Sequence, residues 1–199
     1  MDQIEFRRIS TEDESKLRAQ CIEGLGADQP RTVFDAVQAI PWFRGDDEVL
    51  DALVGLLDSP SQAMRGLALE GLGKLEHSGA LGPLTTFVET HRLDLDEAAA
   101  AVAVIGHVGN EAMVLFLERV IWDGASFALE IRERAVEALL ELAARPIESA
   151  AALLEAVHMS EELEKALVEA GRAARRALNV GEWEEKGFAT IDAELDKEN

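Results

Sequence analysis

The sequence lacks several residue types on which common folds and sites depend. It has no tyrosine, one cysteine and only 5 prolines among 199 residues. A single cysteine cannot form an internal disulfide, and Cys21 has no neighbours at metal-ligand spacing, so we expect it to be a small core residue. Scarce proline and abundant Ala, Leu and Glu predict an all-α fold. The one strand-like alternation, over residues 4–9, is too short and isolated to form a sheet.

Long apolar runs are also missing. No segment approaches the ~18–20 apolar residues needed to span a bilayer, and the N-terminal residues do not resemble a signal peptide. We therefore expect a cytoplasmic protein that does not enter a membrane. No stretch has the composition of a flexible linker, which predicts a single domain over residues 1–199.

Basic residues are few. The chain has 19 Lys and Arg against 39 Asp and Glu, a formal net charge of −20. Such an excess repels nucleic-acid phosphates and anionic lipids and favours a basic protein or peptide as partner. Solubility alone explains the excess equally well.

What the sequence does contain is a repeat. A shared helical pattern is clearest in residues 64–75 and 131–142, and it extends to residues 32–43, 97–108 and, more loosely, 166–177. The central alanines of these five segments are Ala36, Ala68, Ala101, Ala135 and Ala170. They step by 32, 33, 34 and 35 residues, a period that suits two short helices and two turns. Each segment follows another amphipathic stretch, such as residues 47–57.

The boundaries of the repeats carry helix signals. Residues 10–14 resemble a capping box that opens a helix to about Gly24, and Ser59 or Ser61 is available to cap the helix after the turn at residues 58–61. The repeats should span residues 11–178, between atypical terminal caps. Residues 179–199 form either a docked cap or a disordered acidic tail that engages a partner.

The turn Asp58-Ser59-Pro60, followed by Met64-Arg65 and by residues 68–75, resembles the HEAT-like repeat of the phycobilisome-lyase type. The resemblance implies an α-solenoid of about five helical hairpins. It also implies that the arginine after the first apolar residue bonds an acid of a neighbouring repeat. Arg65 and Arg132 occupy that position, whereas the other three repeats have Val33, Ala98 and Leu167 there.

Catalytic and cofactor signals are weak. The glutamates at positions 133, 137 and 141 share one helix face, but three equivalent carboxylates give no sign of the separated pKa values that acid–base catalysis needs. The four histidines are scattered, and the best metal candidate, His91 with Asp94 and Asp96, is equally explained by a polar loop. We expect Gly71 and Gly73 to mark close packing rather than a phosphate loop. We expect no cofactor, no metal and no enzymatic activity.

The resemblance also predicts where a partner binds, because in such stacks the second helix of each pair lines the concave face. The candidate contact residues are Phe34, Gln38, Trp42, Glu70, Lys74, Ala103, His107, Glu133, Glu137 and Glu141. They describe a groove with an aromatic end at Phe34 and Trp42 and an acidic wall on residues 133–141. The alternative is that both aromatic residues belong to the core near Pro41, where residues 40–43 end a helix.

Three functions remain open from the sequence. The first is a non-catalytic adaptor or scaffold that binds a basic protein or peptide. The second is an inhibitor or immunity protein that neutralises a basic toxin or nuclease. The third is an enzyme, because the HEAT-like class includes chromophore lyases and DNA glycosylases. The glycosylase reading conflicts with the net charge of −20, and no chromophore site is identifiable.

Overall fold

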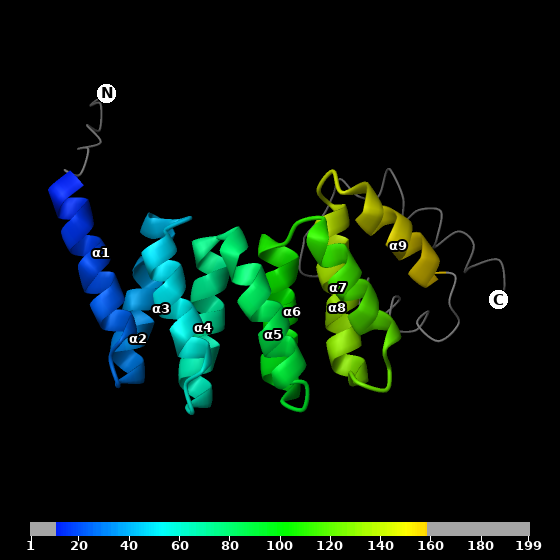
Figure 1. Ribbon diagram of the computed structural model, residues 1–199, viewed down its shortest axis with the longest axis horizontal. Coiled ribbons are helices and arrows are strands. Elements are labelled where there is room, and N and C mark those ends of the chain that lie inside the picture. The colour runs from blue at the N-terminus through cyan, green and yellow to red at the C-terminus, as the bar shows by residue number, and fades with distance from the viewer. Residues whose placement is uncertain (1–10, 159–199) are drawn as a thin grey trace, which may run out of the picture.

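The computed structural model describes residues 11–158, and every regular element within them is helical (Figure 1). The all-α prediction is therefore confirmed for this part of the chain. Three sequence predictions lie outside the described residues: the isolated pattern at 4–9, the fifth repeat segment at 166–177, and the cap or tail at 179–199. The helices are α1 (Thr11–Leu25), α2 (Pro30–Ala39), α3 (Asp47–Leu57), α4 (Gln62–Leu75), α5 (Leu81–Thr90), α6 (Leu95–Val108), α7 (Ala112–Trp122), α8 (Leu129–Ala143) and α9 (Glu148–His158), with 3-10 helices η1 (Ile40–Phe43) and η2 (Ser78–Ala80).

The helices form a row two layers deep. Helices α2, α4, α6 and α8 pack in succession, each on the next, and make one layer. Within the other layer α1 packs on α3 and α7 on α9, while α1, α3, α5 and α7 each pack on the helix that follows them in the chain. The row runs along the long axis of the molecule from α1 to α9 (Figure 1).

Helix α3 shows how the local sequence produces these elements. The Asp46 carboxylate caps its start by accepting hydrogen bonds from the backbone N–H groups of Glu48 and Val49, at 3.0 and 3.1 Å. Its apolar positions fall on one face, with Leu53 among the fully buried side chains. The helix predicted over residues 47–57 coincides with α3, because capping and periodicity agree there.

The prediction that a serine side chain caps α4 is wrong. Ser61 occupies the N-cap position, but its hydroxyl makes no capping hydrogen bond. The Ser59 hydroxyl instead accepts a hydrogen bond from the Ser61 backbone N–H at 3.3 Å, which stabilises the turn before the helix.

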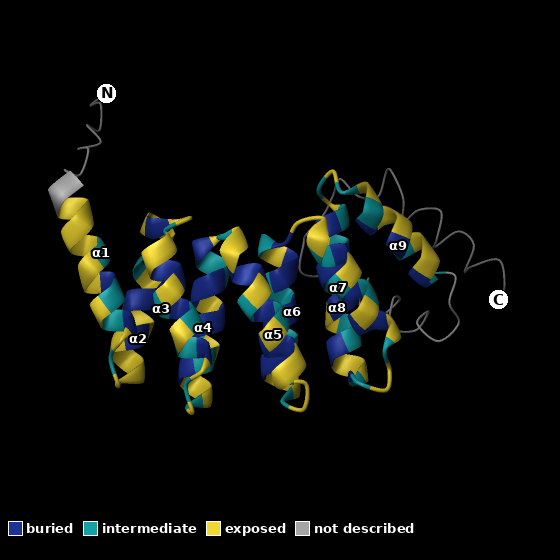
Figure 2. Cartoon of the chain, in the orientation of Figure 1, coloured by how far each residue is buried: buried dark blue, intermediate teal, exposed yellow. Residues whose placement is uncertain are grey.

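Small residues let the layers approach. Four of the five repeat alanines are described, and Ala68, Ala101 and Ala135 have no exposed surface while Ala36 is 8 % exposed. A side chain on Gly71 would lie 2.5 Å from Leu53 Cδ2, so this glycine marks close packing, as predicted. The buried faces point toward neighbouring helices along the whole row (Figure 2).

Cys21 is a core residue, as predicted. It is 4 % exposed on α1, and its thiol lies 3.6 Å from the carbonyl oxygen of Ala36 on α2. Burial, and to a smaller extent the nearby Asp46 carboxylate, raises the pKa of this thiol. The residue therefore joins α1 to α2 as a small, weakly polar packing group.

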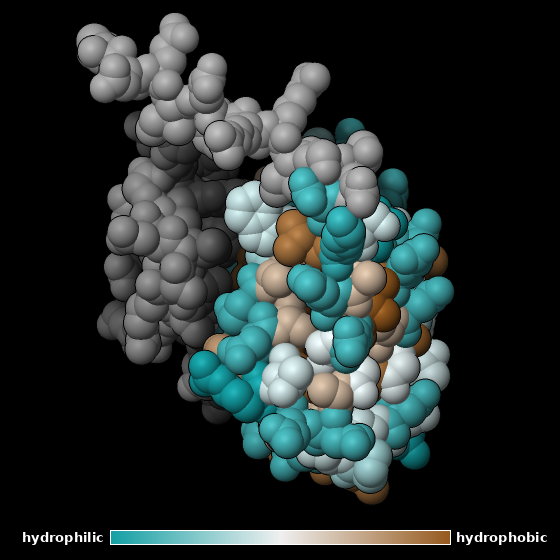
Figure 3. Space-filling view, turned by 90° about the vertical axis from the view of Figure 1, so that its left-hand side faces the viewer, coloured by the Kyte–Doolittle hydropathy of each residue, from teal (hydrophilic) through white to brown (hydrophobic). Residues whose placement is uncertain are grey.

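The N-terminal end of the row is more polar than the interior of the row. The described surface formed around α1 and α2 is mostly hydrophilic, with smaller apolar areas between the polar side chains (Figure 3). The helix predicted to open at residues 10–14 and run to about Gly24 corresponds to α1.

Within residues 11–158, no helix combines the length and the hydrophobicity needed to cross a bilayer.

Candidate functional site

The layer of α2, α4, α6 and α8 carries the residues that the sequence marked as a binding surface. Three of them are joined where α2 meets α4. Lys74 Nζ lies 2.6 Å from Glu70 Oε1 and donates a hydrogen bond to Gln38 Oε1 at 3.0 Å, while Gln38 Nε2 donates to Glu70 at 3.3 Å. The hydrogen bond from Lys74 is the main cause that lowers the pKa of Glu70. The polar groups here are thus already satisfied by one another.

The aromatic end of this surface is exposed. Trp42 is 78 % exposed and Phe34 is 38 % exposed, so neither belongs to the core. Pro41 explains why Trp42 is exposed while its neighbours are buried. At this proline α2 gives way to the tighter helix η1, which buries Ile40 and Phe43 and leaves Trp42 on the surface. The guanidinium of Arg31 lies over the Phe34 ring at 5.5 Å from its centroid.

A second charged cluster links the ends of three elements. Arg44, just after η1, forms an ion pair with Glu76 at 3.0 Å, and His107 Nε2 on α6 lies 4.0 Å from the same Glu76 oxygen. Glu76 ends α4 in the left-handed conformation, with φ of 51°. Glu76 thus lies between a cation after η1 and a histidine on α6.

The predicted acidic wall on α8 is partly neutralised. Arg134 on the same helix forms an ion pair with Glu137. Burial raises the pKa of Glu141, with a small contribution from Glu137, whereas His107, Arg145 and Arg134 act in the opposite direction. Glu133 is half-buried. The stripe therefore consists of glutamates in three different settings rather than three equivalent solvated carboxylates.

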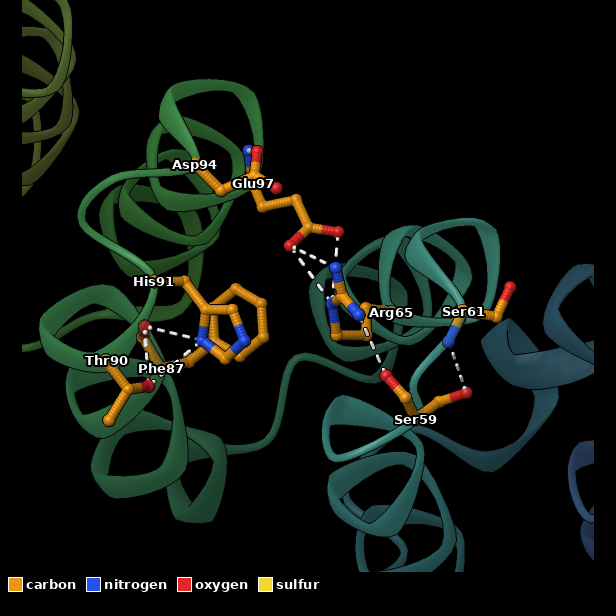
Figure 4. A network of polar contacts seen from close by, with 8 residues as sticks. All are labelled: Ser59, Ser61, Arg65, Phe87, Thr90, His91, Asp94 and Glu97. Atoms are coloured by element: carbon orange, nitrogen blue, oxygen red, sulfur yellow. Dashed lines mark hydrogen bonds and ion pairs between the residues drawn. The ribbon is translucent and has the colours of Figure 1, made fainter.

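The repeat arginine Arg65 is held between two helical pairs (Figure 4). Its Nε and Nη2 contact the Glu97 carboxylate of α6 at 2.9–3.1 Å, and its Nη1 donates to the carbonyl oxygen of Ser59 at 2.9 Å. The Glu97 side chain is 5 % exposed and that of Arg65 is 14 % exposed. Arg65 thus joins α4 to α6 through an acid of the next helical pair.

Arg132 makes a different contact. Its Nε donates to the carbonyl oxygen of Ile121, at the end of α7 in its own helical pair, at 2.7 Å. Orphan carbonyls at a helix C-terminus need such donors. Arg132 therefore closes the α7–α8 turn rather than bridging two pairs through its Nε.

The residues of the best metal candidate are engaged in local structure. The His91 ring stacks on Phe87, with centroids 4.0 Å apart and planes 12° apart, and its Nδ1 contacts Thr90 (Figure 4). Asp94 caps α6 by accepting a hydrogen bond from the Glu97 backbone N–H at 3.5 Å. Across residues 11–158, no group of three or more His, Cys, Asp or Glu side chains is arranged to hold a metal ion.

Sequence reasoning missed two residues that join the repeats. In the aligned segments, Glu97 occupies the position of Met64 and Ile131. An acidic residue at an otherwise apolar position was the signal that could have identified it. Arg145 donates to the backbone carbonyls of Gly106 and Gly109 at 2.9 and 2.8 Å, and also to that of His107. No periodic signal marks Arg145, because it lies in the turn after α8.

No protein-family model matches the chain, and a search of curated proteins also finds no match. What the chain can do must therefore be argued from its own residues. At the α2 end of this layer, Trp42 is exposed on η1; Ala103 on α6 is a small half-buried residue, and the glutamates on α8 differ in setting. Such a surface can bind an extended partner along several helices at once.

Proposed function

We propose that the chain is an α-solenoid of about five HEAT-like hairpins and acts as a protein–protein interaction module for a basic protein or peptide. Support for the architecture comes from the match between repeat period and packing. Successive second helices, α2, α4, α6 and α8, lie next to one another. A stack of this kind offers a continuous binding surface that no single helix pair provides.

The exposure of Trp42 carries the functional part of the proposal. A tryptophan that is 78 % exposed contributes little to folding, and exposed aromatic residues are enriched where partners bind. Nearby side chains are held by the Gln38–Glu70–Lys74 network, so the anchor is presented on an ordered layer. At the other end, the Glu141 carboxylate can pair with a lysine or arginine of the partner. Burial raises the pKa of Glu141, and such a cation would lower it again.

The test compares two charge-reversed forms of the full chain. One form carries Glu133→Lys, Glu137→Lys and Glu141→Lys on α8. The matched control carries Asp51→Lys, Glu111→Lys and Glu155→Lys, three exposed acids in the other layer or its loops, so both forms have the same net charge. Proteins retained from a lysate of the source cells are quantified for each form and for the unchanged chain, and circular dichroism checks that each form is folded.

We expect a basic protein that the unchanged chain and the control retain and the α8 form loses. Trp42→Ala should weaken the same capture without lowering the melting temperature, because its side chain is largely solvated. Equal retention by all forms would show that the α2–α8 layer is not the binding surface.

A further inference from the structure

Half of the exposed large apolar side chains in the described part of the chain gather on two neighbouring turns. Leu93 is 93 % exposed, Leu95 37 %, Trp122 42 % and Leu129 51 %. Leu93 lies in the turn between α5 and α6 and Leu95 begins α6, while Trp122 and Leu129 flank the turn between α7 and α8. We call these four residues the turn-edge patch. Single exposed leucines are common, but a cluster of this kind marks an interaction site.

The packing brings the two turns to the same edge. Helices α6 and α8 run in parallel register, because Gly106 faces Ala138 and Gly109 faces Leu142. Leu95 and Leu129 are the first residues of these two helices, so they lie about one interhelical distance apart, roughly 8–10 Å. Both turns lie along the lower edge of the row in Figure 1.

The odd-numbered helices place the other two patch residues at this edge as well. Arg119 on α7 forms an ion pair with Glu89 on α5. Leu93 follows Glu89 by four residues, and Trp122 follows Arg119 by three. Trp122 is the last residue of α7 and Leu93 lies three residues after the end of α5, so the ion pair between these helices brings both residues toward the same edge.

Neither turn depends on the patch side chains for its conformation. In the α5–α6 turn, the Asp94 backbone N–H donates to the His91 carbonyl oxygen at 2.8 Å, and the His91 ring rests on Phe87. In the α7–α8 turn, the Ser126 N–H donates to Asp123 Oδ1 at 3.1 Å, and Ser126 lowers the pKa of Asp123. The apolar groups are thus displayed on turns that are ordered by other contacts.

An acid follows each of the four apolar residues directly: the pairs are Leu93-Asp94, Leu95-Asp96, Trp122-Asp123 and Leu129-Glu130. Asp94 and Asp123 accept hydrogen bonds within their turns. Asp96 and Glu130 are exposed, and within residues 11–158 neither has an ion-pair partner. The patch therefore combines apolar anchors with carboxylates that remain available to a cation.

We propose that the turn-edge patch docks a basic amphipathic segment of another protein, whose aliphatic side chains cover the four apolar residues and whose lysines or arginines reach Asp96 and Glu130. Charge complementarity selects this occupant. A second copy of the chain would bring the same carboxylates against each other, and an anionic lipid surface would be repelled by them. The patch is distinct from the surface proposed above, because it lies at the first residues of α6 and α8 and at the turns before them, and it shares no residue with the candidate contact residues of the α2–α8 layer.

The test uses the full chain and a labelled amphipathic helical peptide composed of leucine and lysine. Fluorescence anisotropy gives its Kd for the unchanged chain and for the double variant Leu93→Ser/Leu129→Ser. We expect roughly tenfold to hundredfold weaker binding by the double variant, since each buried leucine contributes strongly to association. The matched control is Leu17→Ser on α1, where the leucine is 46 % exposed, and its Kd should not change.

Two further measurements locate the site and its charge requirement. Hydrogen exchange should show peptide-induced protection at residues 91–96 and 122–130, in the unchanged chain and also in the form with three lysines on α8. A peptide with glutamate in place of lysine should not bind, and Asp96→Asn/Glu130→Gln should weaken the lysine peptide and reduce its salt dependence.

The proposal is overturned if the double variant binds the leucine–lysine peptide as well as the unchanged chain does. It is also overturned if the patch serves another occupant. Self-association that the double variant abolishes would assign the patch to a second copy of the chain. Binding to anionic vesicles that the double variant abolishes would assign it to a lipid surface.

Discussion

The seams on the two sides of α6 are built from opposite chemistry. On the α4 side, the buried Arg65–Glu97 ion pair joins the helices, and a side chain on Gly73 would meet Val104 only at an ordinary 3.8 Å. On the α8 side, the contact is so close that a side chain on Gly106 would lie 2.7 Å from the Ala138 backbone. Helix α6 therefore joins α4 through a charge pair and joins α8 through small residues. The two contacts differ although the sequence segments of the three helices follow the same pattern.

The difference has a consequence for stability. A buried ion pair depends on both partners, because either charge alone is costly in a dry environment. A glycine–alanine contact depends on shape alone and tolerates no added volume. The two seams should consequently fail in different ways. Three sets of variants distinguish them, and a fourth set tests two glutamates elsewhere on α4 and α8.

The largest effect is expected at the charged seam. Arg65→Met leaves Glu97 buried without its counter-charge and should lower the free energy of unfolding by about 3–5 kcal/mol. The double variant Arg65→Met/Glu97→Met should recover most of this loss, since Met64 already fills the equivalent position of the preceding repeat. Urea denaturation of all three forms measures both effects. Equal losses in the single and double variants would contradict a role for the uncompensated charge.

The close seam should respond to one added methyl group. Gly106→Ala places a Cβ atom against the Ala138 backbone, which cannot move as a side-chain tip can, and should cost about 1–3 kcal/mol. The control is Gly66→Ala on α4, where a Cβ atom meets nothing within 4 Å. That change should stabilise the helix by about 0.5–1 kcal/mol. Thermal melting of both variants should therefore shift in opposite directions, and shifts of equal sign would refute the steric explanation.

The arginine at the α6–α8 seam should have a smaller effect. Arg145→Ala removes the donors for the carbonyl groups at the end of α6 and should cost about 1–2 kcal/mol, because those carbonyls regain partial hydration. Arg31→Ala is the control, since its side chain is 80 % exposed beside Asp35. It should change the free energy of unfolding by less than about 0.5 kcal/mol. Hydrogen exchange at residues 105–109 would localise the loss in the Arg145 variant.

The smallest effects come from two glutamates whose pKa values shift in opposite directions. The pKa of Glu70 is lowered from 4.5, so its contribution is present above the unfolded pKa and is lost as pH falls through the folded value. The pKa of Glu141 is raised from 4.5, so the folded chain favours the protonated carboxyl. Stability is therefore lost as pH rises from the unfolded pKa through the folded pKa, where this carboxyl ionises. Both side chains are substantially exposed, which limits each effect to a few tenths of a kcal/mol.

Paired substitutions test these signs. At pH 7, Glu70→Gln should lower the melting temperature slightly and Glu141→Gln should raise it slightly. Both differences from the unchanged chain should shrink as the pH falls below the folded pKa of each carboxyl, because the group is then protonated in folded and unfolded chains alike. A destabilising Glu141→Gln at pH 7 would contradict a raised pKa for that carboxyl.

Sequence periodicity was sufficient for the helices but not for the surface residues. The helix over residues 47–57 was predictable because its cap and its apolar face agree. The exposure of Trp42 was not, because an aromatic residue beside Pro41 fits a core helix end and a protruding 3-10 turn equally well. The acidic stripe on α8 illustrates the same limit, since spacing places Glu137 on a face but does not reveal its pairing with Arg134.

The sequence by itself determined the all-α composition, the first helix, the helix at residues 47–57, the helical segments around the central alanines and several small residues at their contacts, because helical periodicity and close packing are local or repeat-encoded properties. Only the tertiary structure decided which charges meet. It paired Arg65 with Glu97, placed Arg145 against the carbonyl groups at the end of α6, and brought the α5–α6 and α7–α8 turns to one edge of the row. These outcomes depend on the register and distance between helices, which the sequence pattern of a single helix does not contain.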